Sequence, residues 1–421
     1  MPRGAVPQKI VRIEKLAPTG EGIARTESGV GFVDGALPGE LVATNVYQVK
    51  KNFWRGRVAA VREPSAQRVG GPHADCPGCD WAFFEDGAAR RTKQELFRET
   101  MQRLGRLDPA AFGELPLVGS PPEYRMRVRM HVEEARVGFF APGTHRVVAA
   151  GACEAIGKGT RRLLPAVESA LRESGVAARE VAILEDVPGT ARVVRVTASA
   201  TPSSCARLAE RLSGFDGVRV LDASGATLDE RGEAALDIVV GGRAFHVSVD
   251  SFFQGNRHLV GPLSAAVGQE ARSAPEGLAL DAFGGAGLFA GALLDAGHRV
   301  VSVESDPGAA ADAAATFSGW EDGGRCEAVR SPLADFLRSD GRHFSCVVAD
   351  PPRAGLGADL ARALAERAER LFVYVSCDPA TLARDLPAVL EEGFAIRSAT
   401  LFDLFAFTHR VEAVISLERA A

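Results

Sequence analysis

The stretch GLALDAFGGAGLFAGALLDAGHRVVSVESD, residues 277–306, decides the fold of the C-terminal part of the chain. A short apolar run is followed by a glycine-rich loop, an apolar segment of helical length, a second β-branched run and an acidic end. We predict a strand, a tight loop, a helix and a second strand, which together begin a parallel sheet. Glycine lets the loop backbone approach a ligand closely, because it has no Cβ and accepts positive φ.

Glu304 ends the second of these strands, where a carboxylate can hydrogen-bond ribose hydroxyls. Together with the loop, it indicates a ligand that contains adenosine. The residues alone do not choose between S-adenosylmethionine and NAD, because GAGLFA at 285–290 also fits a loose GxGxxA pattern. A tight turn that binds no ligand is the third alternative.

The rest of the C-terminal region continues the alternation of strands and helices. Apolar or β-branched runs at 345–349, 371–375 and 411–417 are predicted strands, with helical segments before and between them. This alternation predicts an α/β fold with a doubly wound, mostly parallel sheet, whose ligands lie at the carboxyl ends of the strands.

Three polar residues follow or interrupt these later strands: Asp350, Cys377 and Glu412. Each has an ordinary structural explanation, namely a turn, a small buried thiol and a surface-facing residue of an alternating strand; for Cys377, position alone favours packing. The alternative is chemistry at one edge of the sheet. A thiol becomes a nucleophile when it ionises, and a carboxylate within an apolar strand is rarely buried without a partner.

Residues 6–62 carry short runs with approximate period-two patterning between Gly/Pro-rich turns, which predicts a small β-barrel. The formal net charge of the whole chain, −5, argues against nucleic acid, but residues 1–70 alone carry +5. KKNFWRGR at 50–57 sets basic side chains around Phe53 and Trp54, the mixture that single-stranded RNA binding uses. A strand edge protected by lysines explains the same residues equally well.

We divide the 421 residues into three domains: a barrel at 1–62, a cysteine-containing linker, helix and α+β domain at 63–240, and the α/β domain at 241–421. No apolar run approaches the roughly 20 residues that span a membrane, and the first residues do not resemble a secretory signal. Seven scattered cysteines do not form a disulfide framework. We therefore expect a cytoplasmic enzyme.

Nearly the whole chain resembles the RNA 5-methyluridine methyltransferases, which use S-adenosylmethionine to modify uridines in tRNA or ribosomal RNA. The resemblance rests on several motifs in the right order. GEGIAR, FVDGALPGE and EPSAQRV, within 20–69, resemble the TRAM domain, the RNA-binding barrel of this family. The catalytic part is carried by SFFQGN (251–256), DAFGGAG (281–287), ADPPRAGL (349–356), YVSCDPATLARDL (374–386) and FDLFAFTHRVE (402–412).

The resemblance implies a Rossmann-like class I methyltransferase domain, an OB-like TRAM barrel and a central α+β domain that binds RNA. It makes Cys377 the nucleophile and Glu412 the general base. It places four residues around the cofactor and substrate: Gln254, Phe283, Glu304 and Asp350. Thiolate addition to C6 of uracil would make C5 nucleophilic, and a carboxylate would then remove the C5 proton. The uridine must leave its stack to expose C6.

The cysteines depart from the family pattern, in which three closely spaced cysteines and a distant fourth often hold an iron–sulfur cluster. GPHADCPGCDW (71–81) and AGACEAI (150–156) supply Cys76, Cys79 and Cys153, and the first cysteine of the family is absent. His73 lies close to its expected position. The set could hold a cluster or zinc, or the site could be vestigial.

Two other functions remain as alternatives at the sequence level. An NAD-dependent oxidoreductase would explain the glycine loop but neither Cys377 nor Glu412, and a non-catalytic RNA-binding protein would explain only the barrel. We expect RNA as the partner, with neither DNA nor a membrane, and a monomer. The sequence does not identify the RNA or the uridine.

Overall fold

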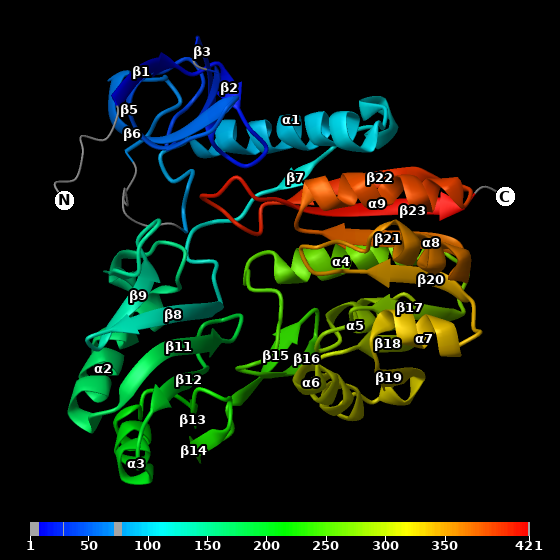
Figure 1. The fold of residues 1–421 in the computed structure, drawn as a ribbon. Helices are drawn as coiled ribbons and strands as arrows, with labels where there is room; N and C mark the ends of the chain where they lie inside the picture. The colour runs from blue at the N-terminus through cyan, green and yellow to red at the C-terminus, as the bar shows by residue number, and fades with distance from the viewer. Residues whose placement is uncertain (1–7, 28, 71–77, 420–421) are drawn as a thin grey trace.

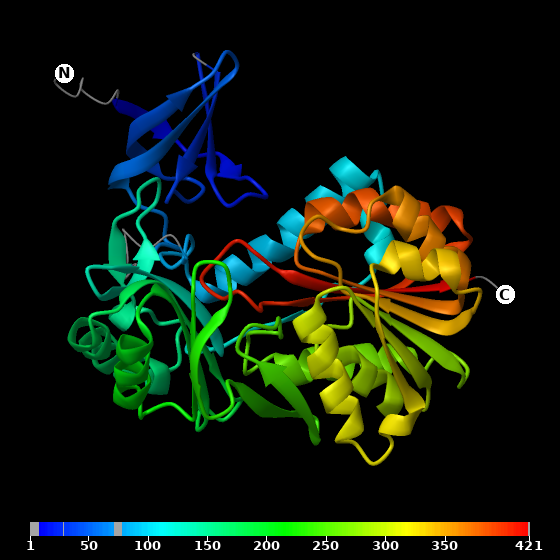
Figure 2. The same cartoon turned by 60° about the horizontal axis from the view of Figure 1, so that its bottom comes forward.

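The computed structural model describes residues 8–27, 29–70 and 78–419, which form three regions in chain order (Figure 1). The first region is built of strands, the second of a sheet with two helices on one face, and the third of a sheet with helices on both faces. Figure 2 shows the same three regions from another side. No helix among the described residues is long and apolar enough to cross a membrane.

The first region is a six-stranded barrel. Its strands are β1 (Gln8–Arg12), β2 (Lys15–Leu16), β3 (Gly22–Thr26), β4 (Gly29–Asp34), β5 (Leu41–Val49) and β6 (Phe53–Glu63). They pair in the order β1-β5-β6-β4-β3-β2. The two ends of this order, β1 and β2, are separated by only two residues, and the Glu14 N–H between them donates to Ile23 O at 2.8 Å. The sheet therefore closes, and the predicted barrel is confirmed.

Trp54 fills the centre of the barrel and is 1% exposed. A Cβ on Gly31 of β4 would overlap the Trp54 ring, so only glycine leaves room for it. Trp54 is therefore a core residue and not the RNA-stacking surface that its basic neighbours suggested. Lys50 and Lys51 are exposed, and Phe53 is half-buried beside them.

The second region is a seven-stranded sheet in the order β10-β9-β8-β11-β12-β13-β14. The strands are β8 (Arg127–Glu133), β9 (Arg136–Phe140), β10 (Val147–Ala149), β11 (Ala177–Glu185), β12 (Arg192–Ser199), β13 (Gly217–Leu221) and β14 (Thr227–Arg231). Helices α2 (Lys158–Ser174) and α3 (Pro202–Arg211) cover one face and share a hydrophobic core with it. A hairpin of β15 (Ala235–Val240) and β16 (Arg243–Ser248) follows, so it straddles the predicted boundary at 240, which stays a prediction.

The third region contains an eight-stranded sheet in the order β19-β18-β17-β20-β21-β23-β22-β7. The strands are β17 (Leu278–Ala282), β18 (Arg299–Glu304), β19 (Cys326–Arg330), β20 (Phe344–Ala349), β21 (Ala368–Ser376), β22 (Phe394–Phe402), β23 (Glu412–Arg419) and β7 (Leu117–Val118). Only β23 runs antiparallel to its neighbours. The chain moves outward from β17 in one direction and then returns to β20 on its other side. The predicted doubly wound sheet is thus confirmed, with its switch point between β17 and β20.

Helices cover both faces of this sheet and form two hydrophobic cores. One face carries α4 (Val260–Ala271), α5 (Leu288–Asp295) and α6 (Pro307–Ser318). The other carries α7 (Leu333–Ser339), α8 (Ala358–Arg367), α9 (Pro379–Glu391) and the distant α1 (Asp86–Gly105).

Helix α1 is the helix that the sequence predicts between the cysteine-containing linker and the α+β domain. Glu85 caps its start by accepting the N–H groups of Gly87 and Ala88, and Arg106 ends it with a left-handed φ of 54°. Its partners were not predicted: α1 packs against α9, and β7 extends the third sheet beside β22. Residues from the second predicted domain therefore help to complete the third region.

Candidate active site

The carboxyl ends of β17, β18, β20 and β21 lie at one edge of the third sheet, because these strands are parallel. Phe283, Glu304, Asp350 and Cys377 occupy these ends. The loop between β16 and α4 brings Gln254 to the same edge, where its Nε2 donates to Asp350 Oδ2 at 2.9 Å. The predicted site residues of this region thus share one edge of the sheet.

The glycine loop turns sharply after β17. Phe283 has a φ of 65°, which is unusual for a residue with a side chain, and Gly285 and Gly287 follow with φ of 54° and 94°. A Cβ on Gly284 would overlap Ser302 Oγ of the neighbouring strand. Backbone shape and close packing both require the small residues that the sequence supplies.

Glu304 spans this loop from the end of β18. One carboxylate oxygen accepts the Gly285 N–H at 3.0 Å, and the other accepts the Asp306 N–H at 2.7 Å. The carboxylate therefore lies directly against the backbone of the glycine loop, in the position expected for a group that binds ribose.

Asp281 was not singled out by the sequence analysis. It is fully buried in β17, accepts the Ala290 N–H at the start of α5 at 3.1 Å, and accepts Ser302 Oγ–H at 3.2 Å. Its Oδ1 has no partner among the described residues. Burial raises the pKa of Asp281 to about 7, although these hydrogen bonds oppose the shift. The sequence signal that could have identified Asp281 is a carboxylate within the otherwise apolar run LALDA.

Asp350 is held between Gln254 and the negative charge of Asp281. Burial raises the pKa of Asp350 to about 7; the Gln254 hydrogen bond opposes the shift and Asp281 adds to it. The loop that follows is fixed by Asp385 of α9, which accepts the N–H groups of Leu356 and Gly357 at 2.7 and 3.1 Å. The loop that carries Asp350 is therefore anchored to α9 at its far end.

Cys377 is half-buried and directly follows β21. Burial raises its pKa to about 12, with further contributions from Glu412 and Asp350, while Arg353 opposes the shift. Asp378 accepts the N–H groups of Ala380 and Thr381 and so caps α9 directly beside the thiol.

Glu412 begins β23 and is 2% exposed. In the antiparallel register the last pair is Ser376 with Ala413, so Cys377 directly follows one member of this pair and Glu412 directly precedes the other. Glu412 Oε1 has no partner among the described residues, and burial together with Asp350 raises the pKa of Glu412 well above its usual value. The fold therefore brings a thiol and a buried carboxyl group to the ends of two paired strands.

The predicted metal ligands lie elsewhere. Cys76 and His73 are outside the described residues, Cys79 is half-buried and Cys153 is buried. Burial is the main cause that raises the pKa of Tyr124 to about 12, and Cys79 and Cys153 both add to the shift. Cys153 and Tyr124 belong to the same hydrophobic core. Within the described ranges, no group of three or more His, Cys, Asp or Glu side chains could hold a metal. The metal site stays a prediction.

Comparison with known proteins identifies the family. A family model described as tRNA (uracil-5-)-methyltransferase matches residues 333–420, and a TRAM domain model matches residues 9–59. A Streptomyces avermitilis protein named as an uncharacterized RNA methyltransferase is 33% identical, with 98% of both chains covered. The 23S rRNA (uracil(1939)-C(5))-methyltransferase RlmD of Halomonas elongata is 31% identical, with 96% of this chain and 88% of that protein covered. The chain belongs to the RNA uracil-5-methyltransferases.

The fold of this RNA uracil-5-methyltransferase is that of a solved Pyrococcus abyssi structure. That protein, a tRNA (uracil-54, C5)-methyltransferase in complex with S-adenosyl-L-homocysteine, superposes with a TM-score of 0.79 over 98% of this chain and all of that one, at 20% identity. Family membership resolves the cofactor alternative left by the glycine loop, because these enzymes depend on S-adenosylmethionine and not on NAD. It also confirms the TRAM assignment of the barrel.

Proposed function

We propose that this protein methylates C5 of a uridine in ribosomal or transfer RNA through a covalent bond between Cys377 and C6 of the base. The observation that carries the proposal is the juxtaposition of Cys377 with Glu412 across adjacent strands, beside Asp350. An enzyme that methylated a ring nitrogen or an oxygen would need no thiol at this position.

The residues at the glycine loop fit the cofactor. Gly284 and Gly287 leave no room for side chains, Glu304 presents a carboxylate, and the partly buried Phe283 packs against one of the two cores of the sheet. These residues would hold S-adenosylmethionine, which when bound supplies an electrophilic methyl group.

Cys377 makes C5 of the base reactive. Its thiolate forms a bond to C6, and the electron pair of the C5–C6 double bond moves toward O4, which leaves C5 nucleophilic. The raised pKa of Cys377 means that the thiol is protonated before RNA binds. Arg353 is the cationic side chain that favours its ionisation, and the bound uracil must supply the rest of the activation.

Glu412 then completes the reaction. After C5 has gained its methyl group, the carboxylate takes the C5 proton, the double bond re-forms, and Cys377 leaves as a thiolate. A raised pKa makes the ionised carboxylate a stronger base, which suits a proton on carbon. Gln254 and Asp350, which are hydrogen-bonded to each other, would contact the uracil edge or the cofactor.

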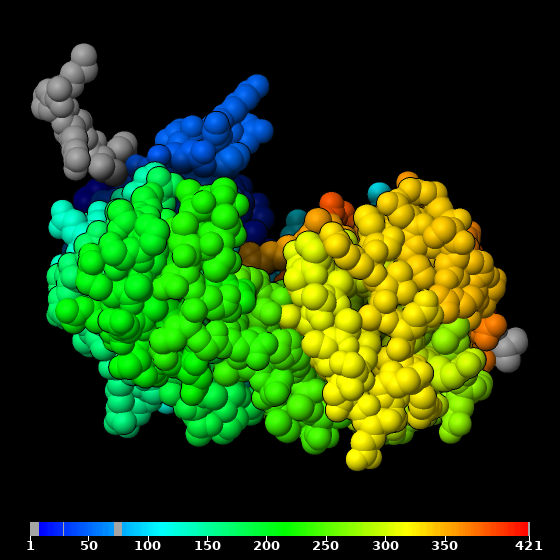
Figure 3. Space-filling view, turned by 90° about the horizontal axis from the view of Figure 1, so that it is seen from below, coloured from blue at the N-terminus to red at the C-terminus, as the bar shows by residue number. Residues whose placement is uncertain are grey.

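The choice of RNA follows from weaker observations. The Halomonas relative, which resembles this chain over nearly its whole length, is named for 23S rRNA, while the Pyrococcus neighbour of lower identity is named for tRNA. We propose a single-stranded or loop uridine that is flipped into the site, bound by a monomer in the cytoplasm. Figure 3 shows a hollow between the second and third regions that could accommodate such a strand.

A covalent trap tests the proposal. RNA that carries 5-fluorouridine cannot lose its C5 substituent as a proton, so the enzyme should remain attached to it in the presence of S-adenosylmethionine. Wild-type protein should form an adduct that survives SDS, and Cys377→Ala should form none. Turnover by Cys377→Ala comparable to wild type would overturn the covalent mechanism. Trials with both rRNA and tRNA fragments would identify the substrate.

We also propose that Cys76, Cys79 and Cys153, with His73, bind an iron–sulfur cluster or zinc. Cys79 and Cys153 are far apart in the sequence, but both affect the pKa of Tyr124, and Cys153 shares a hydrophobic core with this residue, which supports the proposal. Iron, sulfide and zinc should be measured on protein purified without oxygen. Less than a tenth of an equivalent of every metal would contradict the proposal.

A further inference from the structure

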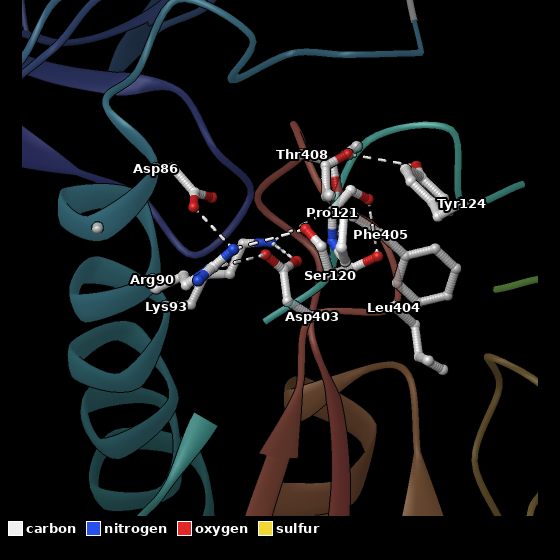
Figure 4. A network of polar contacts seen from close by, with 12 residues as sticks. Asp86, Arg90, Lys93, Ser120, Pro121, Tyr124, Asp403, Leu404, Phe405 and Thr408 are labelled. Carbon is white, nitrogen blue, oxygen red and sulfur yellow. Dashed lines mark hydrogen bonds and ion pairs between the residues drawn. The ribbon is translucent and has the colours of Figure 1, made fainter. Parts of the chain in front are cut away.

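A buried ion pair joins α1 to the end of β22. Lys93 Nζ lies 2.5 Å from Asp403 Oδ1, and the two side chains are 1% and 3% exposed. Lys93 Nζ also lies 3.5 Å from Phe405 O. Figure 4 shows Lys93 and Arg90 pointing from α1 toward Asp403. Burial lowers the pKa of Lys93, and Asp403 opposes that shift.

This pair stands at the base of the loop that leads to Glu412. Asp403 follows Phe402, and Phe402 pairs directly with Glu412 in the ladder between β22 and β23. The loop 403–411 therefore leaves and re-enters the sheet at this rung. Any movement of Asp403 acts on the backbone position that faces Glu412.

The same network reaches the loop that carries Gln254. Asn256 Nδ2 donates to Leu404 O and to Ser120 Oγ, both at 2.9 Å. Arg90 links these groups to α1, because its Nε lies 3.8 Å from Asp403 Oδ2 and its Nη2 donates to Ser120 O at 3.5 Å. Tyr124 O–H donates to Ala406 O at 3.2 Å further along the loop (Figure 4).

A buried ion pair adds little free energy of stabilisation when it joins two surfaces. Removing two charges from water often costs more than their attraction returns, and apolar side chains of similar size usually serve stability as well or better. What charged hydrogen bonds provide is a fixed distance and direction. Here they fix a helix and a loop that are 310 residues apart in the chain.

We propose that Lys93 and Asp403 are positioning residues that hold Glu412 in place for removal of the C5 proton. The proposal rests on the function proposed above. Helix α1 supplies no group that touches the reacting atoms, but through Lys93 it would affect the removal of the C5 proton.

The step at which this positioning acts is specific. Cys377 Sγ is already bonded to C6 and the new methyl group is on C5 when Glu412 takes the C5 proton; the C–H electron pair then forms the C5–C6 double bond and the C6–S bond breaks. A displaced Glu412 slows this step and leaves the earlier bond formation intact. The methylated covalent intermediate should therefore accumulate on ordinary RNA.

The test uses Lys93→Met and Asp403→Asn in the full-length protein, compared with wild type on RNA that carries hydrogen or deuterium at the target C5. We expect kcat to fall by about tenfold or more, with KM for S-adenosylmethionine unchanged. The deuterium isotope effect on kcat should rise, and an SDS-stable methylated adduct should appear. Glu99→Gln is the matched control, because it removes an α1 ion pair with Lys15 that faces the barrel.

The outcomes separate this proposal from the function itself. Wild type that forms no adduct with 5-fluorouridine RNA would overturn the covalent mechanism, and the positioning role with it. If wild type forms the adduct but both variants lose adduct and turnover in parallel, without a larger isotope effect, only the positioning role is wrong. Should the single variants fail to fold, the Lys93→Met/Asp403→Leu double variant, which leaves no unpaired charge, carries the same measurements.

Discussion

The Cys377 thiol lies among more negative than positive groups. Glu412, Asp350 and Asp378 all raise its pKa beyond the effect of burial, and the positive charge of Arg353 opposes them. Most thiols that act as nucleophiles are activated by nearby cations. Under the proposed mechanism, the Cys377 thiol is therefore activated only when the uracil and the positively charged cofactor bind, and it stays protonated before then.

This electrostatic arrangement predicts opposite effects for two substitutions. Asp378→Asn removes a negative charge and should lower the pKa of Cys377, whereas Arg353→Met removes the opposing cation and should raise it. The rate of Cys377 alkylation by iodoacetamide, followed by peptide mass spectrometry from pH 7 to 11, reports both. Identical pH profiles for the two variants would contradict the assignment. Asn can accept the same α9 N–H bonds as Asp378, so the helix cap is retained.

Glu412 predicts a pH dependence with a definite sign. Its pKa is raised and it must be ionised to act as a base, so turnover should increase with pH through the raised pKa. Glu412→Gln should lose about 10²- to 10⁴-fold in kcat, lose this dependence, and accumulate methylated RNA bound to Cys377. Single-turnover assays with labelled methyl donor measure all three. A Glu412→Gln enzyme that released its product at the wild-type rate would exclude Glu412 as the base.

At the scale of elements, local pattern was enough wherever an element carries its own signal. The β17–loop–α5–β18 unit could be predicted from the sequence because apolar runs, glycines and an acidic end follow one another in a fixed order. Helix α1 could be predicted because the signals for it, helical periodicity and a glycine at its end, lie within its own sequence. Strand β7 was not, because two residues have no periodicity. The Lys93–Asp403 pair could not be found either, because its members are distant in sequence and each looks like an ordinary surface charge.

The barrel offers a prediction for a single element. Gly31→Ala would place a methyl group within the Trp54 ring and should destabilise the barrel by about 1–3 kcal/mol, as overpacking usually does. Gly70→Ala is the control, because a Cβ there meets nothing within 4 Å. Urea unfolding followed by Trp fluorescence measures both. Equal midpoints for the two variants would show that the barrel can repack around Trp54.

At the scale of the whole molecule, charge separates the regions. The barrel end is basic while the remainder is acidic, so long-range attraction should direct RNA to Lys50 and Lys51 and leave cofactor binding unaffected. Lys50→Gln/Lys51→Gln should weaken RNA binding and reduce the slope of log K against log salt by roughly 1 to 2. Arg272→Gln, an exposed cation on the third region, is the control. An unchanged slope in the double variant would place the RNA elsewhere.

The placement of α1 and β7 also has a consequence for synthesis on the ribosome. Phe97 and Met101 of α1 are covered by residues of the third region, which leave the ribosome only after about 270 further residues have been added. At 5–20 residues per second this delay is roughly 14 to 54 s. During that time the apolar face of α1 remains exposed, because the third region that packs against it has not been synthesised. We therefore expect the nascent chain to bind chaperones that shield apolar surfaces.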